Sequence, residues 1–344
     1  MHVPDGFIDA PTSAATAVGA AGALALSLRG ARRELDERTA PLAGLVAAFI
    51  FAVQMLNFPV AAGTSGHLLG GALAAILVGP CTGVLCVSVV LLMQGILFAD
   101  GGLTALGVNI TDMAVVTTVV AYAVFRGLVK VLPRGRRSVT GAAFVAALLS
   151  VPAAAGAFTL LYAVGGTTDV AIGKVAGAMI GVHVLIGVGE AAITALTVGA
   201  VIAVRPDLVY GARGLRQGLK LRVHGELVDA PEPTAPAAAR TSRRGLWISG
   251  LAASLVLGGF VSYYASASPD GLEKVAHDHG IDSKTREHAS AGSPLADYGV
   301  EDVSDARLSG GLAGVIGVGT TVVAGSAVFW AVRRRRTGTP SEVR

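Results

Sequence analysis

Long apolar segments separated by short charged stretches constrain this chain more than any other feature. Nine such segments occur, at about 11–28, 41–57, 67–79, 81–99, 107–130, 140–164, 174–204, 246–265 and 309–332. A helix that crosses the apolar interior of a bilayer needs about 20 residues, and most of the segments approach that length. Only 15% of the residues are charged, against about 25% in soluble domains. The sequence therefore predicts an all-α integral membrane protein.

The charged residues indicate how the chain is threaded through the membrane. Basic residues cluster after the first, fifth, seventh and last apolar segments, at 29–38, 126–137, 205–222 and 333–336. Basic loops stay cytoplasmic, so we expect the N-terminus, residues 58–66, residues 100–102 and a loop at 266–308 to face outside. The C-terminus is then cytoplasmic, in a multi-pass plasma-membrane protein. The start at Met1-His2 lacks the basic residues of a signal peptide, and we expect it to be retained.

The same patterns exclude several functions. The net charge of +4 comes from clusters beside apolar segments, which favours lipid contact over nucleic-acid binding. The two cysteines, Cys81 and Cys86, lie inside an apolar segment, so a disulfide framework or thiolate metal site is not expected. The sequence contains no phosphate-binding loop of the GxxxxGK[ST] kind and no convincing nucleophile–base pattern. We expect neither ATP hydrolysis nor another enzymatic activity from the chain, and no cofactor.

A Pro/Ala-rich stretch divides the chain into two parts. Residues 223–245 contain three prolines among alanines and read as a cytoplasmic linker. The sequence predicts a unit of seven helices over 1–222 before it. After it, residues 246–334 are expected to form a hairpin of two transmembrane helices around the external loop 266–308.

The segment 67–79 points to a binding site. It is too short to span a bilayer at about 1.5 Å per residue, and it follows a Gly/Pro-containing stretch at 58–66. Non-helical backbone at membrane depth is tolerated where it lines a cavity or is buried in protein. We expect His67 to begin this short helix and to lie within the site.

His2 is the most informative candidate metal ligand. The Met1 amine, the His2 amide nitrogen and the His2 imidazole can close two fused chelate rings around one ion. Three nitrogens in a plane suit Ni²⁺ or Cu²⁺ and not Mg²⁺ or Ca²⁺, which prefer oxygen. His67 could supply a fourth nitrogen from the same side of the membrane. The alternative is an exposed terminal histidine and a hydrogen-bonded histidine without a metal.

Further polar residues lie within or beside the apolar segments. We expect Gln94, Asn109, Asp112 and Asn57 to orient His67 through its second ring nitrogen, although buried amides also join helices. The set of candidate residues that support the ligands overlaps with these. This set is Asn57, Thr64, Gln94, Asp100, Asn109 and His183. His183 and Glu190 share a helix face, and we favour a structural role for them. His277, His279 and His288 of the acidic external loop could concentrate cations or could be solvated surface groups.

Several blocks of residues closely resemble the substrate-binding components of cobalt/nickel energy-coupling-factor transporters, the CbiM/NikM family. The blocks are Met1–Phe7, Asn57–Pro59 with Gly63–Gly71, Phe98–Gly107 and His183–Ala191, and the likeness covers about residues 1–220. Residues 269–273, Pro-Asp-Gly-Leu-Glu, resemble the marker of the small accessory component of the CbiN/NikN kind.

The resemblance implies a seven-helix protein that captures Ni²⁺ or Co²⁺ as cargo, fused to its accessory component. It implies a planar site made by the Met1 amine, the His2 amide and imidazole, and the His67 imidazole. The implied partners are a transmembrane coupling subunit and two ATP-binding-cassette ATPases.

Two other functions compete with metal capture. A secondary transporter that works without ATPases predicts two matching interrupted helices, and only one interrupted segment occurs. An intramembrane metalloenzyme needs an open coordination position and a general base, and four nitrogens in a plane leave no base nearby. We further expect the external loop to touch the site near Met1-His2 or residues 58–66 and to assist loading without supplying permanent ligands.

Overall fold

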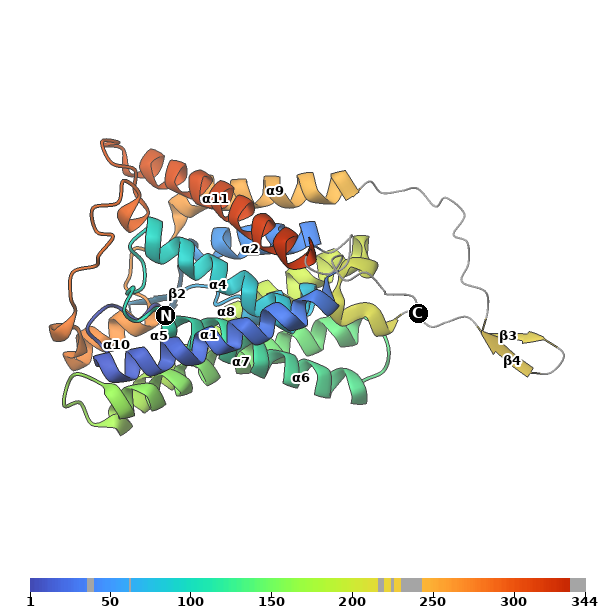
Figure 1. Cartoon of the computed structure of the whole chain (residues 1–344), viewed down its shortest axis with the longest axis horizontal. Coiled ribbons are helices and arrows are strands. Elements are labelled where there is room, and N and C mark those ends of the chain that lie inside the picture. The colour runs from blue at the N-terminus through green and yellow to red at the C-terminus, as the bar shows by residue number, and fades with distance from the viewer. Residues whose placement is uncertain (36–39, 62, 216–219, 224–225, 230–242, 335–344) are drawn as a thin grey trace, which may run out of the picture.

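The computed structural model describes residues 1–35, 40–61, 63–215, 220–223, 226–229 and 243–334. Its first part is a bundle of helices (Figure 1). They are α1 (Ala10–Glu34), α2 (Ala40–Gln54), α3 (Gly71–Val78), α4 (Pro80–Leu97), α5 (Leu106–Asn109), the π-helix η1 (Ile110–Val116), α6 (Thr117–Val131), α7 (Arg136–Gly165) and α8 (Ile172–Val204). Two 3₁₀ turns follow, η2 (Pro206–Leu208) and η3 (Tyr210–Leu215).

Each predicted apolar segment corresponds to a helix or to one continuous helical run. The segment at 107–130 becomes the run formed by α5, η1 and α6. Within the described residues, seven helical segments are long and apolar enough to cross a membrane, and α2 is a shorter apolar helix. The prediction of an all-α membrane protein is confirmed, and the molecule is a multi-pass membrane protein.

The second part of the chain packs against α2. It contains α9 (Arg243–Gly259), η4 (Val261–Tyr264), α10 (Gly271–His279), η5 (Ile281–Lys284), η6 (Ala296–Tyr298) and α11 (Ala306–Arg334). Gly258 of α9 and Gly314 of α11 meet so closely that a Cβ on Gly314 would lie 2.0 Å from the carbonyl oxygen of Gly258. Gly325 of α11 also lies close to Gly44 of α2. Small residues allow this close packing, which compensates for the weak hydrophobic drive between helices in lipid.

Two short hairpins were not expected from the sequence. β1 (Phe58–Ala61) pairs antiparallel with β2 (Thr64–Gly66), in the stretch predicted to be non-helical. β3 (Lys220–Val223) pairs with β4 (Glu226–Asp229) at the start of the predicted linker. Residues 230–242, which hold most of that linker, lie outside the described residues.

The expectation that His67 begins a helix was wrong, because α3 starts only at Gly71. The preceding residue, Gly70, has φ +90°, a conformation that glycine adopts without steric cost. The buried carboxylate of Glu190 in α8 accepts hydrogen bonds from the main-chain N–H groups of Leu69 and Gly70, at 2.6 and 3.0 Å. These bonds satisfy donors outside the helix and hold His67 in an extended segment.

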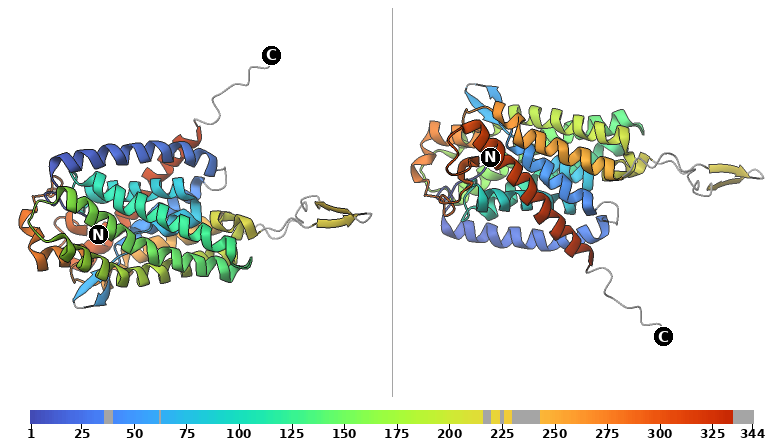
Figure 2. Two further views of the ribbon diagram at one scale, coloured as in Figure 1. Left: turned by 90° about the horizontal axis from the view of Figure 1, so that it is seen from below. Right: turned by 90° about the horizontal axis from the view of Figure 1, so that it is seen from above.

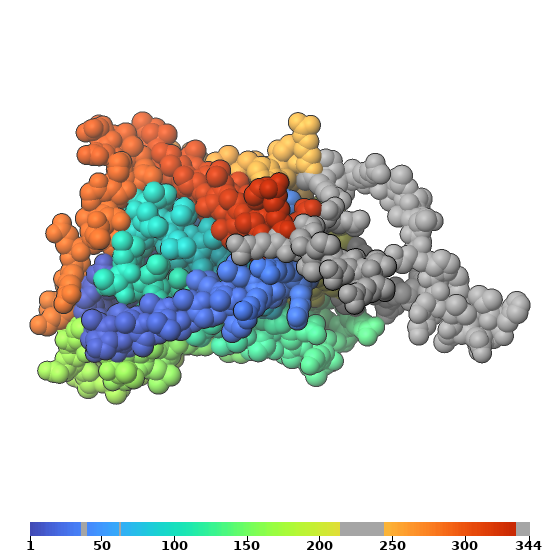
Figure 3. Space-filling model, viewed as in Figure 1, coloured from blue at the N-terminus to red at the C-terminus, as the bar shows by residue number. Residues whose placement is uncertain are grey.

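The N-terminus and the segment between α9 and α11 meet at one end of the bundle. Figure 2 shows the N-terminus near that end from two directions. In the space-filling view the segment forms a continuous strap, orange in Figure 3, that descends from α11 across the end of the bundle. Any site built from Met1 or His2 therefore lies beneath or beside this strap.

Candidate metal centre

The N-terminal residues are fixed by hydrogen bonds to the loop before α5 and to α5 itself. The Asn109 side chain accepts from the Val3 N–H at 2.7 Å and donates to the Val3 carbonyl at 3.1 Å. The Gly102 N–H donates to the same carbonyl at 2.9 Å. Asp5 accepts from the main chain and hydroxyl of Thr104. These bonds hold the N-terminus inside the protein, and Met1 is only 2% exposed.

His67 presents one ring nitrogen to the Met1 amine. Its Nδ1–H donates to the carbonyl of Leu68 at 3.0 Å, which leaves the Nε2 lone pair available. Nε2 lies 2.5 Å from the Met1 nitrogen. Two nitrogens that bind one ion at about 2.0–2.1 Å and at a right angle lie about 2.9 Å apart. The pair is therefore close to the spacing of two neighbouring metal ligands.

His2 is oriented by two residues at the end of α4. Its Nε2–H donates to Oε1 of Gln94 at 3.1 Å, and its Nδ1 lies 3.3 Å from Oδ1 of Asp100. The bond to Gln94 leaves Nδ1 as the nitrogen that can bind a metal. Burial lowers the pKa of His2 to about 4, although Asp100 opposes that shift. The ring is thus neutral at pH 7, as a metal ligand must be.

The rings of His2 and His67 lie side by side, with centroids 5.1 Å apart and an angle of 18° between their planes. The structure thus brings all three residues predicted as ligands, Met1, His2 and His67, into one buried cluster. Main-chain and imidazole nitrogens suit Ni²⁺ or Co²⁺ better than the oxygen-seeking Mg²⁺ and Ca²⁺.

A carboxylate from the second part of the chain completes the cluster. Oδ2 of Asp270 lies 2.7 Å from the Met1 amine and 3.5 Å from Nε2 of His67. Burial alone would raise the pKa of Asp270, but the amine and His67 outweigh it and hold that pKa well below its usual value. Sequence reasoning noted Asp270 only as one acid of an external loop. Its position within the Pro-Asp-Gly-Leu-Glu block was the sequence signal that could have identified it as a residue of the site.

The residues expected to orient the ligands take different places. Gln94 and Asp100 contact His2, and Asn109 contacts Val3. Nδ1 of His67 bonds to Leu68 instead, so the expectation that Gln94, Asn109, Asp112 and Asn57 orient this ring was wrong. Asn57 lines the cavity above the site, and its carbonyl accepts from the Ser266 N–H at 2.7 Å. Thr64 is buried in β2. Asp112, buried in η1, has no hydrogen-bond partner for either carboxylate oxygen.

His183, for which a structural role was expected, lies beside the cluster. Its Nδ1 bonds to the Met179 carbonyl at 2.7 Å, and its Nε2 has no hydrogen-bond partner. The ring lines a small pocket with Met1, His67 and Asp270. Glu190, by contrast, is bonded to the backbone that follows His67, as described above.

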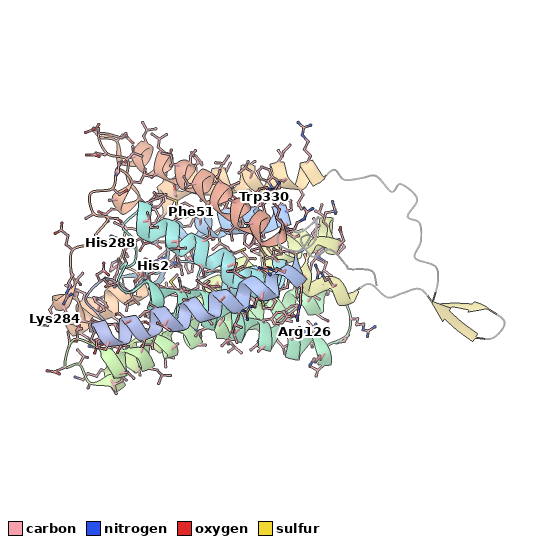
Figure 4. All side chains as sticks on the ribbon, in the orientation of Figure 1. His2, Phe51, Arg126, Lys284, His288 and Trp330 are labelled. Atoms are coloured by element: carbon pink, nitrogen blue, oxygen red, sulfur yellow. The ribbon has the colours of Figure 1, made fainter. Side chains whose placement is uncertain are left out.

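The cluster opens into a cavity of about 750 Å³ under the strap. Its wall includes His2, His67, Asp100, Asp270, Glu273 and His288. His288 bonds through Nε2 to the Gly101 carbonyl at 3.1 Å, and Figure 4 shows it beside His2. His277 is solvent-exposed and bonds to Asp282. Within the described ranges, no group of three or more His, Cys, Asp or Glu side chains could hold an ion by itself, so a metal centre here also needs the Met1 amine and main-chain nitrogen as ligands.

A helical membrane bundle with these nitrogen donors buried at one end defines a membrane transport protein for metal cations. Residues 2–208 match the CbiM family model, described as a cobalt uptake substrate-specific transmembrane region. Residues 244–334 match the PDGLE domain. The chain belongs to the CbiM family and is not an enzyme.

Similar proteins support this assignment. A putative metal transport protein of Haloquadratum walsbyi is 40% identical over 61% of this chain and 94% of its own length. A putative fused nickel transport protein of Archaeoglobus fulgidus is 40% identical over 61% of this chain and 68% of its own length. A crystal structure of a transition metal transporter superposes with a TM-score of 0.51 at 27% identity, over 59% of this chain and 93% of that one.

Proposed function

We propose that this chain is the substrate-capture component of an energy-coupling-factor importer and that it takes up Ni²⁺ or Co²⁺ from outside the cell. The observation that carries the proposal is the buried pair formed by the Met1 amine and Nε2 of His67, 2.5 Å apart. The amine also forms an ion pair with Asp270, which holds it beside the imidazole nitrogen. The spacing of the amine and the imidazole nitrogen is what two neighbouring ligands of one metal require.

The proposed ligands are the Met1 amine, the His2 amide nitrogen, Nδ1 of His2 and Nε2 of His67. The first three close two fused chelate rings, and a planar set of four nitrogens favours ions such as Ni²⁺. Gln94 supports this assignment because it occupies Nε2 of His2 and leaves Nδ1 free. Asn57, Thr64, Asp100, Asn109 and His183 are proposed to shape and support this site.

The names of two relatives suggest which metal this chain transports. The Archaeoglobus fulgidus relative is named as a fused nickel transport protein, and one from Geobacter sulfurreducens as a cobalt transport protein. Both ions accept imidazole ligands, so we propose that the cargo is one of these two.

We further propose that energy comes from partners, namely a transmembrane coupling subunit and two ATPases, since the sequence has no phosphate-binding loop. The capture domain would be 1–222, and the accessory domain 246–334. The site would face outside and the C-terminus the cytoplasm. Basic residues support this orientation, because Arg126 lies at the end of the molecule opposite to His2 (Figure 4).

The free amine provides the sharpest test. A fusion that extends the chain before Met1 should abolish Ni²⁺ and Co²⁺ binding by the purified protein, because the amine becomes an amide. Cleavage of the fusion immediately before Met1 should restore binding, and the same extension at the C-terminus serves as the control. Undiminished binding by the uncleaved, correctly folded fusion would refute the proposed site.

Uptake into vesicles separates this function from secondary transport. Vesicles with this chain alone should not accumulate Ni²⁺, and addition of the coupling subunit, the ATPases and ATP should start uptake. Accumulation driven by an ion gradient without ATPases would favour the secondary transporter instead.

A further inference from the structure

The two carboxylate oxygens of Asp270 bond to different parts of the protein. Asp270 is the N-cap of α10, and its Oδ1 accepts from the Glu273 N–H at 2.8 Å. Glu273 returns the bond, since its carboxylate accepts from the Asp270 N–H at 2.8 Å. This capping box uses only one carboxylate oxygen of Asp270. The other, Oδ2, points to the Met1 amine and His67.

The main chain before Asp270 is bonded to the segment that carries His67. The Ser65 N–H donates to the Pro269 carbonyl at 2.9 Å, and the Ser65 hydroxyl donates to the Ser268 carbonyl at 2.8 Å. Ser65 lies two residues before His67 in the sequence. The position of Asp270 relative to the His67 ring is thus set by bonds between the two parts of the chain.

Gly271 allows α10 to approach the site. A Cβ at this position would lie 2.8 Å from Cδ1 of Ile186 and 3.2 Å from Cε1 of His183. A larger residue would require these side chains of α8 to move or the start of α10 to shift. Gly271 therefore lets Asp270 approach the site without either change.

The distances among three donor atoms fit a common ion. The Met1 nitrogen, Nε2 of His67 and Oδ2 of Asp270 are separated by 2.5, 2.7 and 3.5 Å. The circle through these atoms has a radius of about 1.8 Å, so two points, one on each side of the plane of the three atoms, lie at a ligand distance of about 2.0–2.1 Å from all three. If the four nitrogens occupy a plane, this oxygen must approach the ion from one face.

We propose that Asp270 is a fifth ligand of the transported metal, contributed by the PDGLE domain to the site of the capture domain. This inference rests on the proposed function and departs from the expectation that the external loop supplies no ligand. Before loading, the same oxygen holds the Met1 amine against His67. The centre is thus complete only when the two domains are packed together.

The test compares variants that keep the helix cap. Asp270→Asn and Asp270→Ser both retain an N-cap acceptor for the Glu273 N–H. The asparagine removes the negative charge, and the shorter serine side chain has no second oxygen that could bind the ion. Asp278→Asn is the matched control, because it removes a charge from the exposed end of the same helix, where Asp278 pairs with Lys274. Ni²⁺ affinity is measured on the purified full-length proteins, and Cu²⁺ serves as a paramagnetic probe of the ligand set.

We expect Asp270→Asn and Asp270→Ser to weaken Ni²⁺ binding by tenfold or more, and Asp278→Asn to change it by less than about threefold. The electron paramagnetic resonance spectrum of bound Cu²⁺ should shift in both Asp270 variants toward that of four planar nitrogens. Wild-type affinity and an unchanged Cu²⁺ spectrum in both variants would overturn the role of Asp270 alone. A wild-type protein that binds no metal, or an N-terminally extended one that binds it normally, would instead refute the proposed function.

Discussion

At the scale of single residues, three histidines in the capture domain differ in what their second nitrogen does. His67 bonds to its neighbour's carbonyl, which leaves its Nε2 to face the Met1 amine. His2 bonds to Gln94, which leaves its Nδ1 beside Asp100. His183 bonds to Met179 and keeps a nitrogen without a hydrogen-bond partner in the adjoining pocket. The first two rings are therefore oriented as ligands. The third forms part of the wall.

His67→Ala should lower Ni²⁺ affinity well beyond tenfold, because it removes a donor from the proposed plane. His183→Ala should stay within about the tenfold range that loss of a supporting group produces. Isothermal titration of the two purified variants beside the wild type decides the matter. Equal losses would mean that His183 is itself a ligand.

At the scale of elements, the short helix α3 depends on a carboxylate of α8. Glu190 accepts from two main-chain N–H groups just before α3 and so fixes the segment that contains His67. A buried N–H without a partner costs about 1–3 kcal/mol. Glu190 thus connects the stability of the bundle to the geometry of the site.

Glu190→Ala should lower both thermal stability in detergent and Ni²⁺ affinity, because two buried donors lose their acceptor and His67 is released. Glu190→Gln keeps one acceptor oxygen and should have a smaller effect. Thr194→Ala, one turn further along α8, is the control, since that buried hydroxyl has no hydrogen-bond partner. If Glu190→Ala behaved like Thr194→Ala, the carboxylate would not position α3.

At the scale of the whole molecule, the PDGLE domain closes over the capture domain through main-chain bonds. Ser266 donates to Asn57, Arg286 to Asp5 and Asp297 to Phe98, all at 2.7–2.9 Å. Main-chain bonds tie the strap to three separate segments around the site. The domain therefore forms the roof of the cavity.

The strap's histidines should differ in their effect on uptake. His277→Ala combined with His279→Ala should leave the initial rate of Ni²⁺ uptake within about twofold, because His277 lies in solvent and bonds only to Asp282 within the described residues. His288→Ala should slow uptake, because it removes the bond to the Gly101 carbonyl beside His2. The rates are measured in vesicles with the partner ATPases. A slow double variant with a normal His288→Ala would reverse this assignment.

The sequence by itself determined the helices and singled out the histidines proposed as ligands, because both depend on local signals. An apolar segment of membrane length forms a helix wherever it is placed, and a histidine at position 2 can chelate through its own backbone. Tertiary structure decided what depends on distant contacts. The meeting of Asp270 with Met1 joins opposite parts of the chain, and the pairing of Gln94 with His2 rather than His67 depends on how α4 packs. Hydrogen bonds between residues far apart in the sequence cannot be read from local composition, so only the packed fold could assign these partners.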